Sequence, residues 1–176
     1  SNEIYSDRNA YLFTFTPPLR SENSRIKILK NISAFDTIAT DSCAFFKKDK
    51  KKFRNDATKI PMGIASSELL LPLVYTYAVK SSHMSLYDLQ QKLSTNPAKI
   101  FSIPKKGEIK KGYYADLCIF DPNESFAVKS SELSHRCDYS VYEGLKLYGK
   151  VKKTFLRGTQ VYDGNHQVYS HPGKMV

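Results

Sequence analysis

Hydrophobic and polar residues alternate at residues 11–16, where large apolar side chains are separated by smaller polar ones. This two-residue period predicts a β-strand, which stops at Pro17 and Pro18 because proline has no N–H to donate. In residues 24–35 apolar side chains instead recur about once per helical turn, which predicts a helix with one buried face. A short apolar stretch at residues 36–40 predicts another strand, so this part of the chain predicts a strand–helix–strand unit.

Two further stretches predict helices in the interior. Residues 67–79 are apolar on almost every side, which is typical of a helix that is buried on most sides. Pro72 interrupts the helical hydrogen bonding, so we expect a kink or a late start near it. Ser85 is suited to cap a following helix, with Asp88 three residues later as its capping-box partner. Pro97 stands at the first turn of one more short helix, where proline is tolerated.

The character of the sequence changes after residue 104, where short apolar runs are separated by turn dipeptides. Residues 117–120 and 151–156 predict strands, and residues 157–164 predict a hairpin that closes the sheet. The chain therefore combines a helix-rich first part with a strand-rich second part.

Composition places the chain among globular proteins. It has 176 residues, 41% of them hydrophobic, which is enough for one core of domain size. No apolar run reaches the length of about 18 residues that a membrane span needs. Three cysteines, an odd number without a C-x-x-C pair, fit reduced thiols better than a disulfide framework. We therefore expect a cytoplasmic protein that has no membrane partner.

The net charge of +10 raises the alternative of a nucleic-acid-binding module. The densest basic run is residues 47–54, and we interpret it as a solvated loop. No helix-turn-helix, zinc-finger or RNA-recognition motif accompanies it, so attraction to phosphates would be non-specific and salt-dependent. We expect no nucleic-acid partner.

Asp41 is the strongest candidate for chemistry. It ends an apolar stretch and is followed at once by a polar loop, which is where αβ barrels place their catalytic groups. Taken by itself, an aspartate at a strand end more often caps the next loop. Motifs that recur in a fixed order around it, at residues 58–63, 94–101, 106–109 and 112–117, make the catalytic interpretation the better one.

In that order the motifs resemble the last third of a cyclic amidohydrolase of the D-hydantoinase/dihydropyrimidinase family, over roughly residues 11–164. The resemblance implies an α/β fold: the carboxyl-terminal fragment of a TIM barrel followed by strands of a small β-sandwich. Residues 1–103 would hold the last βαβ unit and helices of the barrel, residues 104–164 the sandwich strands, and residues 165–176 a tail. Complete members are much longer, so the chain is expected to be part of an enzyme.

The resemblance also implies the chemistry. Family members open a cyclic amide with two bridged divalent metal ions, usually zinc, which lower the pKa of a bound water. An aspartate at the end of the eighth strand ligates one metal and carries the proton to the leaving nitrogen, and that residue is Asp41 here. Thr16 and Met62 match the two residues whose backbone contacts the substrate ring, although the family usually has asparagine in place of Met62.

Departures from the family pattern concern the metal site. Ser42 stands where the family usually has histidine, and the His-x-His pair and the bridging lysine are absent. The four histidines are His83, His135, His166 and His171, and none forms a metal-binding pair. The two metals, and activity on a small cyclic amide, are therefore expected only of the complete enzyme. This chain by itself is expected to bind no metal tightly and to be inactive.

Two other features have plainer interpretations. Cys43 lies two residues after Asp41 but lacks a paired base, so we interpret it as a small buried residue and not as a nucleophile. Tyr142-Glu143-Gly144 is a family marker of the sandwich, which we interpret as turn and packing chemistry.

The alternative function comes from another class of protein. Collapsin response mediator proteins resemble this motif order but have lost their metal ligands and serve in assembly. Ser42 favours such a loss, whereas Asp41 favours an enzyme. Upstream metal ligands would decide between the two. Complete relatives are commonly tetramers, so we expect a homo-oligomer in either case.

Overall fold

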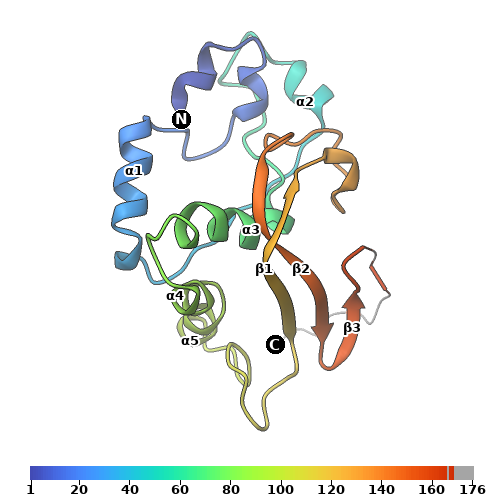
Figure 1. Cartoon of the computed structure of the whole chain (residues 1–176). Helices are drawn as coiled ribbons and strands as arrows, with labels where there is room; N and C mark the ends of the chain where they lie inside the picture. The colour runs from blue at the N-terminus through green and yellow to red at the C-terminus, as the bar shows by residue number, and fades with distance from the viewer. Residues whose placement is uncertain (166, 169–176) are drawn as a thin grey trace.

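The computed structural model describes residues 1–165 and 167–168. Helices pack along one side of a small twisted sheet, and a lobe of short helices lies at one end (Figure 1). The α-helices are α1 (Glu22–Lys30), α2 (Lys47–Lys51), α3 (Leu70–Val74), α4 (Leu86–Gln90) and α5 (Asn96–Ile100). Short 3₁₀ helices span Asn2–Ser6, Ala10–Phe13, Ile32–Ala34, Ser67–Leu69 and Ser130–Glu132, and π-helical turns span Tyr75–Val79 and Gln91–Thr95.

The sheet has three antiparallel strands in the order β1 (Leu117–Ala127), β2 (Lys146–Leu156) and β3 (Thr159–Tyr162). β1 runs on past the predicted end at residue 120, because its register with β2 shifts between Asp121 and Ser125 and so accommodates Pro122. Arg157 and Gly158 join β2 to β3 with φ angles of 48° and 82°, which matches the tight two-residue turn of a twisted hairpin. The predicted sheet and hairpin are confirmed.

The predicted helices form with changed boundaries, but they are less buried than expected. Helix α1 has no buried residue, and within residues 67–79 the buried ones are Leu69, Pro72 and Ala78. Helix α1 starts earlier than expected, because Ser21 caps it by accepting a hydrogen bond from Ser24 N. The 3₁₀ helix before α3 delays the α-helical bonding to Leu70, so that Pro72 falls in the first turn, where its missing N–H costs little.

The predicted capping box closes at the start of α4. Asp88 N donates to Ser85 Oγ (3.0 Å), and Ser85 N donates to Asp88 Oδ2 (3.2 Å). Helix α4 then continues through the π-helical turn Gln91–Thr95 into α5, which carries Pro97 at its start. Local hydrogen bonding between near neighbours thus sets both ends of this helical segment.

The two strands of the predicted βαβ unit are not formed within the described residues, so that part of the prediction is wrong for this chain. Residues 11–13 belong to the 3₁₀ helix Ala10–Phe13, and residues 37–40 are extended without a ladder. A strand needs a neighbour that pairs its backbone groups along its length. Here only isolated bonds form, such as Gly63 N to Thr14 O (2.9 Å) and Ile38 N to Lys92 O (3.2 Å).

Two apolar clusters hold the fold together. Tyr11, Leu12 and Ile60 form one, which includes two residues of the 3₁₀ helix Ala10–Phe13. Leu69, Val128 and Leu147 form the other, which joins the start of the α3 segment to the sheet. Burying such side chains stabilises the fold by roughly 1.5–3 kcal/mol each.

Two other expectations concern a membrane-spanning helix and the C-terminal tail. No helix within residues 1–165 and 167–168 is long and apolar enough to cross a membrane. The predicted tail, residues 165–176, lies outside the described residues apart from Asn165, Gln167 and Val168.

Candidate functional site

A pocket of about 270 Å³ opens where the ends of the extended segments meet α3. It is lined by Phe15, Thr16, Ile38, Ala39, Thr40, Asp41, Ile64, Ser66, Leu70, Leu73, Val74 and Tyr142. Asp41 is the one charged residue among these, and most of the wall is apolar. The structure therefore brings Thr16 and Asp41, predicted from distant parts of the sequence, to one pocket.

The loop after Asp41 is fixed by hydrogen bonds to residues 64–66. Asp41 has a φ of 45°, in the left-handed region that aspartate tolerates better than most residues. Ser42 Oγ donates to Ile64 O (3.3 Å) and accepts from Ser66 N (3.1 Å), while Cys43 N donates to Ile64 O (3.2 Å). Ser42, the departure from the family pattern, thus ties the loop that carries Asp41 to the opposite wall.

Met62 does not line the pocket in this structure, and its side chain is 42% exposed. The N–H of its neighbour Gly63 donates to Thr14 O (2.9 Å), two residues before Thr16, which lines the pocket. The role of the Met62 backbone in substrate binding stays a prediction. Cys43, expected to be buried, is exposed, because its loop lies at the surface.

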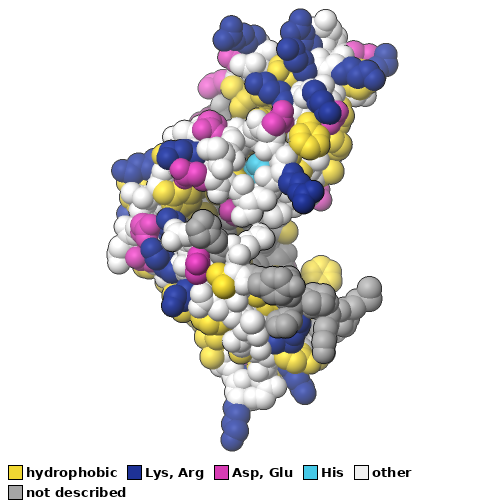
Figure 2. Space-filling model, turned by 90° about the vertical axis from the view of Figure 1, so that its right-hand side faces the viewer, with side chains coloured by type: hydrophobic (Ala, Val, Ile, Leu, Met, Phe, Trp, Pro, Cys, Tyr) yellow, Lys and Arg dark blue, Asp and Glu magenta, His cyan; other side chains and the backbone are white. Residues whose placement is uncertain are grey.

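Lys50 positions the segment that leads to Thr16, although the basic run that contains it was predicted to be a solvated loop. Lysine and arginine side chains gather at the end of the molecule that carries α2 (Figure 2), yet the Lys50 side chain is fully buried there. Its Nζ donates to Thr14 O (2.7 Å), Thr14 Oγ1 (3.1 Å) and Leu12 O (3.4 Å). Burial lowers the pKa of the Lys50 ammonium to about 8. Phe53, three residues later, packs against the cluster of Tyr11, Leu12 and Ile60. An apolar residue at this spacing was the signal in the sequence that one side of the basic run is buried.

Lys92 has the same role for the segment that leads to Asp41. This side chain is buried, and its Nζ donates to Ser33 O (3.3 Å) and to Phe35 O. Asn96 Nδ2 adds a bond to Asp36 O (2.9 Å). Charged and amide donors from the α4–α5 segment therefore satisfy carbonyls that a neighbouring strand would otherwise pair.

The described residues do not form a metal site by themselves. Among residues 1–165 and 167–168, no group of three or more His, Cys, Asp or Glu side chains could hold a metal ion. Asp41 offers a single carboxylate, and a catalytic zinc site takes about three protein ligands. The donor set present here does not fit a pair of metal ions.

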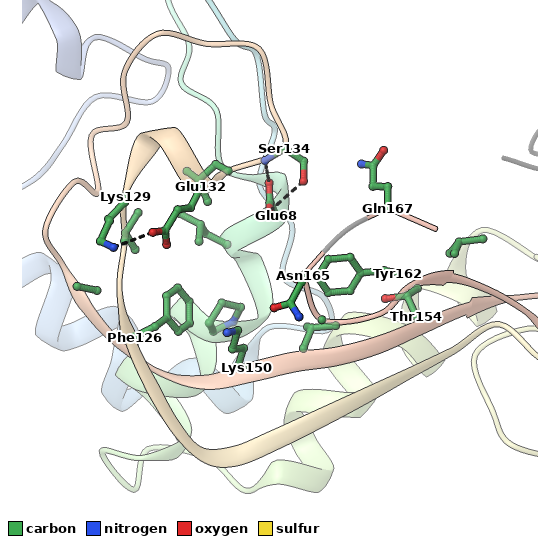
Figure 3. A pocket seen from close by; sticks show the side chains of 18 of the residues that line it. Glu68, Phe126, Lys129, Glu132, Ser134, Lys150, Thr154, Tyr162, Asn165 and Gln167 are labelled. Atoms are coloured by element: carbon green, nitrogen blue, oxygen red, sulfur yellow. Dashed lines mark hydrogen bonds and ion pairs between the residues drawn. The ribbon is translucent and has the colours of Figure 1, made fainter. Parts of the chain in front are cut away.

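A larger hollow of about 1170 Å³ lies on the face of the sheet, away from Asp41. Figure 3 shows Phe126 and Lys150 along its sheet wall and Glu68 across from them. Glu68 accepts from Ser134 N (2.6 Å), and Lys129 forms an ion pair with Glu132 (2.7 Å). Lys150 pairs with Glu124, which does not line the hollow (3.2 Å). Each of these charged groups thus has its own partner, and we interpret the hollow as a packing surface.

Comparisons with known proteins agree with the predicted resemblance. A sequence model of the amidohydrolase family matches residues 9–161. A dihydroorotase of Staphylococcus epidermidis is 34% identical over 92% of this chain and 37% of its own length, and a D-hydantoinase of Ralstonia pickettii is 35% identical over 86% and 34%. A crystal structure of D-hydantoinase superposes with a TM-score of 0.88 at 31% identity, over 96% of this chain and 38% of that one. The chain spans little more than a third of these relatives.

Proposed function

The chain belongs to the amidohydrolase family, and from this premise we propose that it forms the carboxyl-terminal portion of a metal-dependent hydrolase that opens the cyclic amide of hydantoins or dihydropyrimidines. The observation that supports the proposal best is the shared pocket of Asp41 and Thr16. Two residues that the family pattern assigns to chemistry and to ring binding face one cavity, although 25 positions separate them in the sequence.

Asp41 is the residue that would move protons. Its carboxylate lies exposed at the pocket, where it can accept a proton from an attacking water and pass it to the leaving ring nitrogen. Thr16 would present backbone groups to the ring amide, held in place by the anchoring of Thr14 to Lys50 and Gly63. The apolar walls would exclude water from the remaining faces of the ring.

The metal ions of such an enzyme need ligands that the described residues do not offer. The two divalent ions, for which zinc is the candidate, would therefore be held mainly by groups outside these 176 residues. As part of the proposal, the isolated chain binds no zinc tightly and has no hydrolase activity. Other parts of the proposal are a cytoplasmic location and a homo-oligomer.

The proposed organisation keeps residues 1–103 as the barrel portion, residues 104–164 as the sandwich portion and residues 165–176 as a tail. The change from helices to strands after residue 103 supports the first boundary. The apolar hollow on the face of the sheet supports the idea that this portion packs against further chain.

Two measurements test the proposal together. Hydrolysis of hydantoin and of 5,6-dihydrouracil is measured with the natural protein that contains this chain, and zinc binding is measured with the 176-residue chain alone. We expect metal-dependent ring opening in the first case and no stoichiometric zinc in the second. A natural protein that folds, carries metal and opens neither ring would contradict the enzymatic proposal. One that folds without binding metal and opens neither ring would favour the assembly alternative.

A further inference from the structure

Tyr142 belongs to the pocket as well as to the core, although its sequence motif predicts only turn and packing roles. Among the described residues that line the pocket, Tyr142 alone comes from residues 104–164. Its backbone is fixed on both sides, since its N–H donates to Ser140 Oγ (3.1 Å) and its carbonyl accepts from Leu145 N (2.9 Å). Its ring packs against the cluster of Leu69, Val128 and Leu147. The strand-rich part of the chain thus holds one polar side chain rigidly at the wall shared with Asp41.

The hydrogen bonds of Tyr142 to other described residues involve its backbone, which leaves its hydroxyl group available to a ligand. A second hydroxyl in the same pocket, Ser66 Oγ, is buried without a partner, and Ser66 is only 7% exposed. Buried polar groups nearly always find a partner, and those that lack one call for a ligand or a bound water. A buried hydroxyl without a partner, beside the hydroxyl of Tyr142 in one small pocket, points to a polar ligand there.

The chemistry of the wall defines what that ligand offers. Burial raises the pKa of Tyr142, so the phenol stays protonated near neutral pH and donates a hydrogen bond. The described lining residues include no lysine or arginine, and their single charge is the carboxylate of Asp41. This wall would repel an anionic group and suits a neutral acceptor such as an amide carbonyl.

We propose that Tyr142 is a specificity-determining residue of this site, whose hydroxyl donates a hydrogen bond to a carbonyl oxygen of a neutral cyclic amide. The inference rests on the proposed function and adds a substrate contact from the part of the chain beyond the barrel portion. Because the contact exists in the bound ground state as well as during reaction, it acts mainly on substrate binding.

The test compares Tyr142→Phe with Tyr139→Phe in the natural protein that contains this chain. Each substitution removes one phenol oxygen from the same loop, but Tyr139 packs on the other cluster and does not line the pocket. With 5,6-dihydrouracil as substrate, Tyr142→Phe should raise KM about tenfold and leave kcat within about twofold, the loss of one neutral hydrogen bond. Tyr139→Phe should change neither constant.

Thermal melting of both variants separates binding from folding. An unchanged KM for Tyr142→Phe, whether or not its melting temperature falls, would overturn the inference and leave the proposed function standing. An equal rise of KM in both variants would also overturn it, because the effect would then come from the loop. A wild-type protein that opens no ring would overturn the proposed function and this inference with it.

Discussion

The backbone of Gly63 lies directly against the backbone of Cys43: a Cβ on Gly63 would stand 2.3 Å from the carbonyl oxygen of Cys43 and 2.7 Å from its Cβ. Gly63 has a φ of 152°, which L side chains rarely adopt. Its N–H meanwhile donates to Thr14 O (2.9 Å). Gly63 therefore joins the segment that leads to Thr16 with the loop that carries Asp41, and it can do so only without a side chain.

We expect Gly63→Ala to lower the free energy of unfolding by about 2–4 kcal/mol, because backbone atoms cannot give way as a flexible side chain would. Urea denaturation of the chain measures this loss. Gly112→Ala is the matched control, since Gly112 also has a positive φ of 87° but nothing within 4 Å of an added Cβ. Equal losses for the two variants would mean that backbone strain, and not the approach to Cys43, sets the cost.

Asp41→Asn should leave the fold intact and reduce turnover of the natural protein by 10²–10⁴-fold, because an amide cannot accept the proton. Ring hydrolysis and circular dichroism measure the two effects. Asp36→Asn serves as the control, since Asp36 is exposed at the start of the same segment and does not line the pocket. Retention of more than about one-tenth of the rate by Asp41→Asn would remove this residue from the catalytic role.

Ser42→Ala should cost about 1–2 kcal/mol of stability, because it removes the bond to Ile64 O and leaves Ser66 N without its acceptor. In the natural protein it should also lower kcat without abolishing it, since the loop that carries Asp41 loses its tie to the opposite wall. Ser67→Ala, at an exposed neighbouring position, is the comparison. If both variants behave alike in denaturation and turnover, the Ser42 hydroxyl has no positioning role.

Lys50 predicts an unusual dependence of stability on pH. Its pKa is about 8 in the folded protein, below the ordinary value of 10.5. Between these two values the unfolded chain binds the proton and the folded chain does not, so the contribution of Lys50 to stability rises with pH. Below pH 8 both states are protonated, and the full cost of the buried charge is present.

Comparison of wild type with Lys50→Met between pH 7 and 10 isolates this contribution. The wild type should gain stability over the variant with a slope of at most about 1.4 kcal/mol per pH unit above pH 8. Lys51→Met, which alters an exposed lysine of the same helix, should run parallel to the wild type. If the stability of Lys50→Met also runs parallel to that of the wild type, burial does not shift the pKa of the Lys50 ammonium.

The apolar hollow on the sheet predicts self-association of the chain. Val161 lies on the last strand and lines that hollow, whereas Gln160, the residue before it, does not. Sedimentation at tens of micromolar should show a dimer or larger species, because open sheet edges and apolar faces recruit other chains. Val161→Lys should weaken association, and Gln160→Lys should leave it nearly unchanged. A stable wild-type monomer with a cooperative melt would contradict this prediction.

Local signals in the sequence determined much of this protein. The capping box of Ser85 and Asp88 and the turn at Arg157 and Gly158 form as predicted, because each depends on residues only a few positions apart. The order of short motifs likewise identified the family and, through it, Asp41. Such features need no knowledge of what lies across the fold.

Other features were decided by the tertiary structure alone. Residues 11–16 carry a strand pattern, but a strand exists only where a neighbour pairs its backbone, and residues 11–13 adopt a 3₁₀ helix instead. Lys50 stands in a run of lysines that are otherwise exposed, and its burial depends on the carbonyls of Leu12 and Thr14 that the fold places next to it. Tyr142 reaches the pocket of Asp41 across about 100 residues of chain, and no motif in the sequence predicted that it would line this pocket. Burial and pocket membership depend on which distant segments meet, and the periodicity of a single segment carries no information about that.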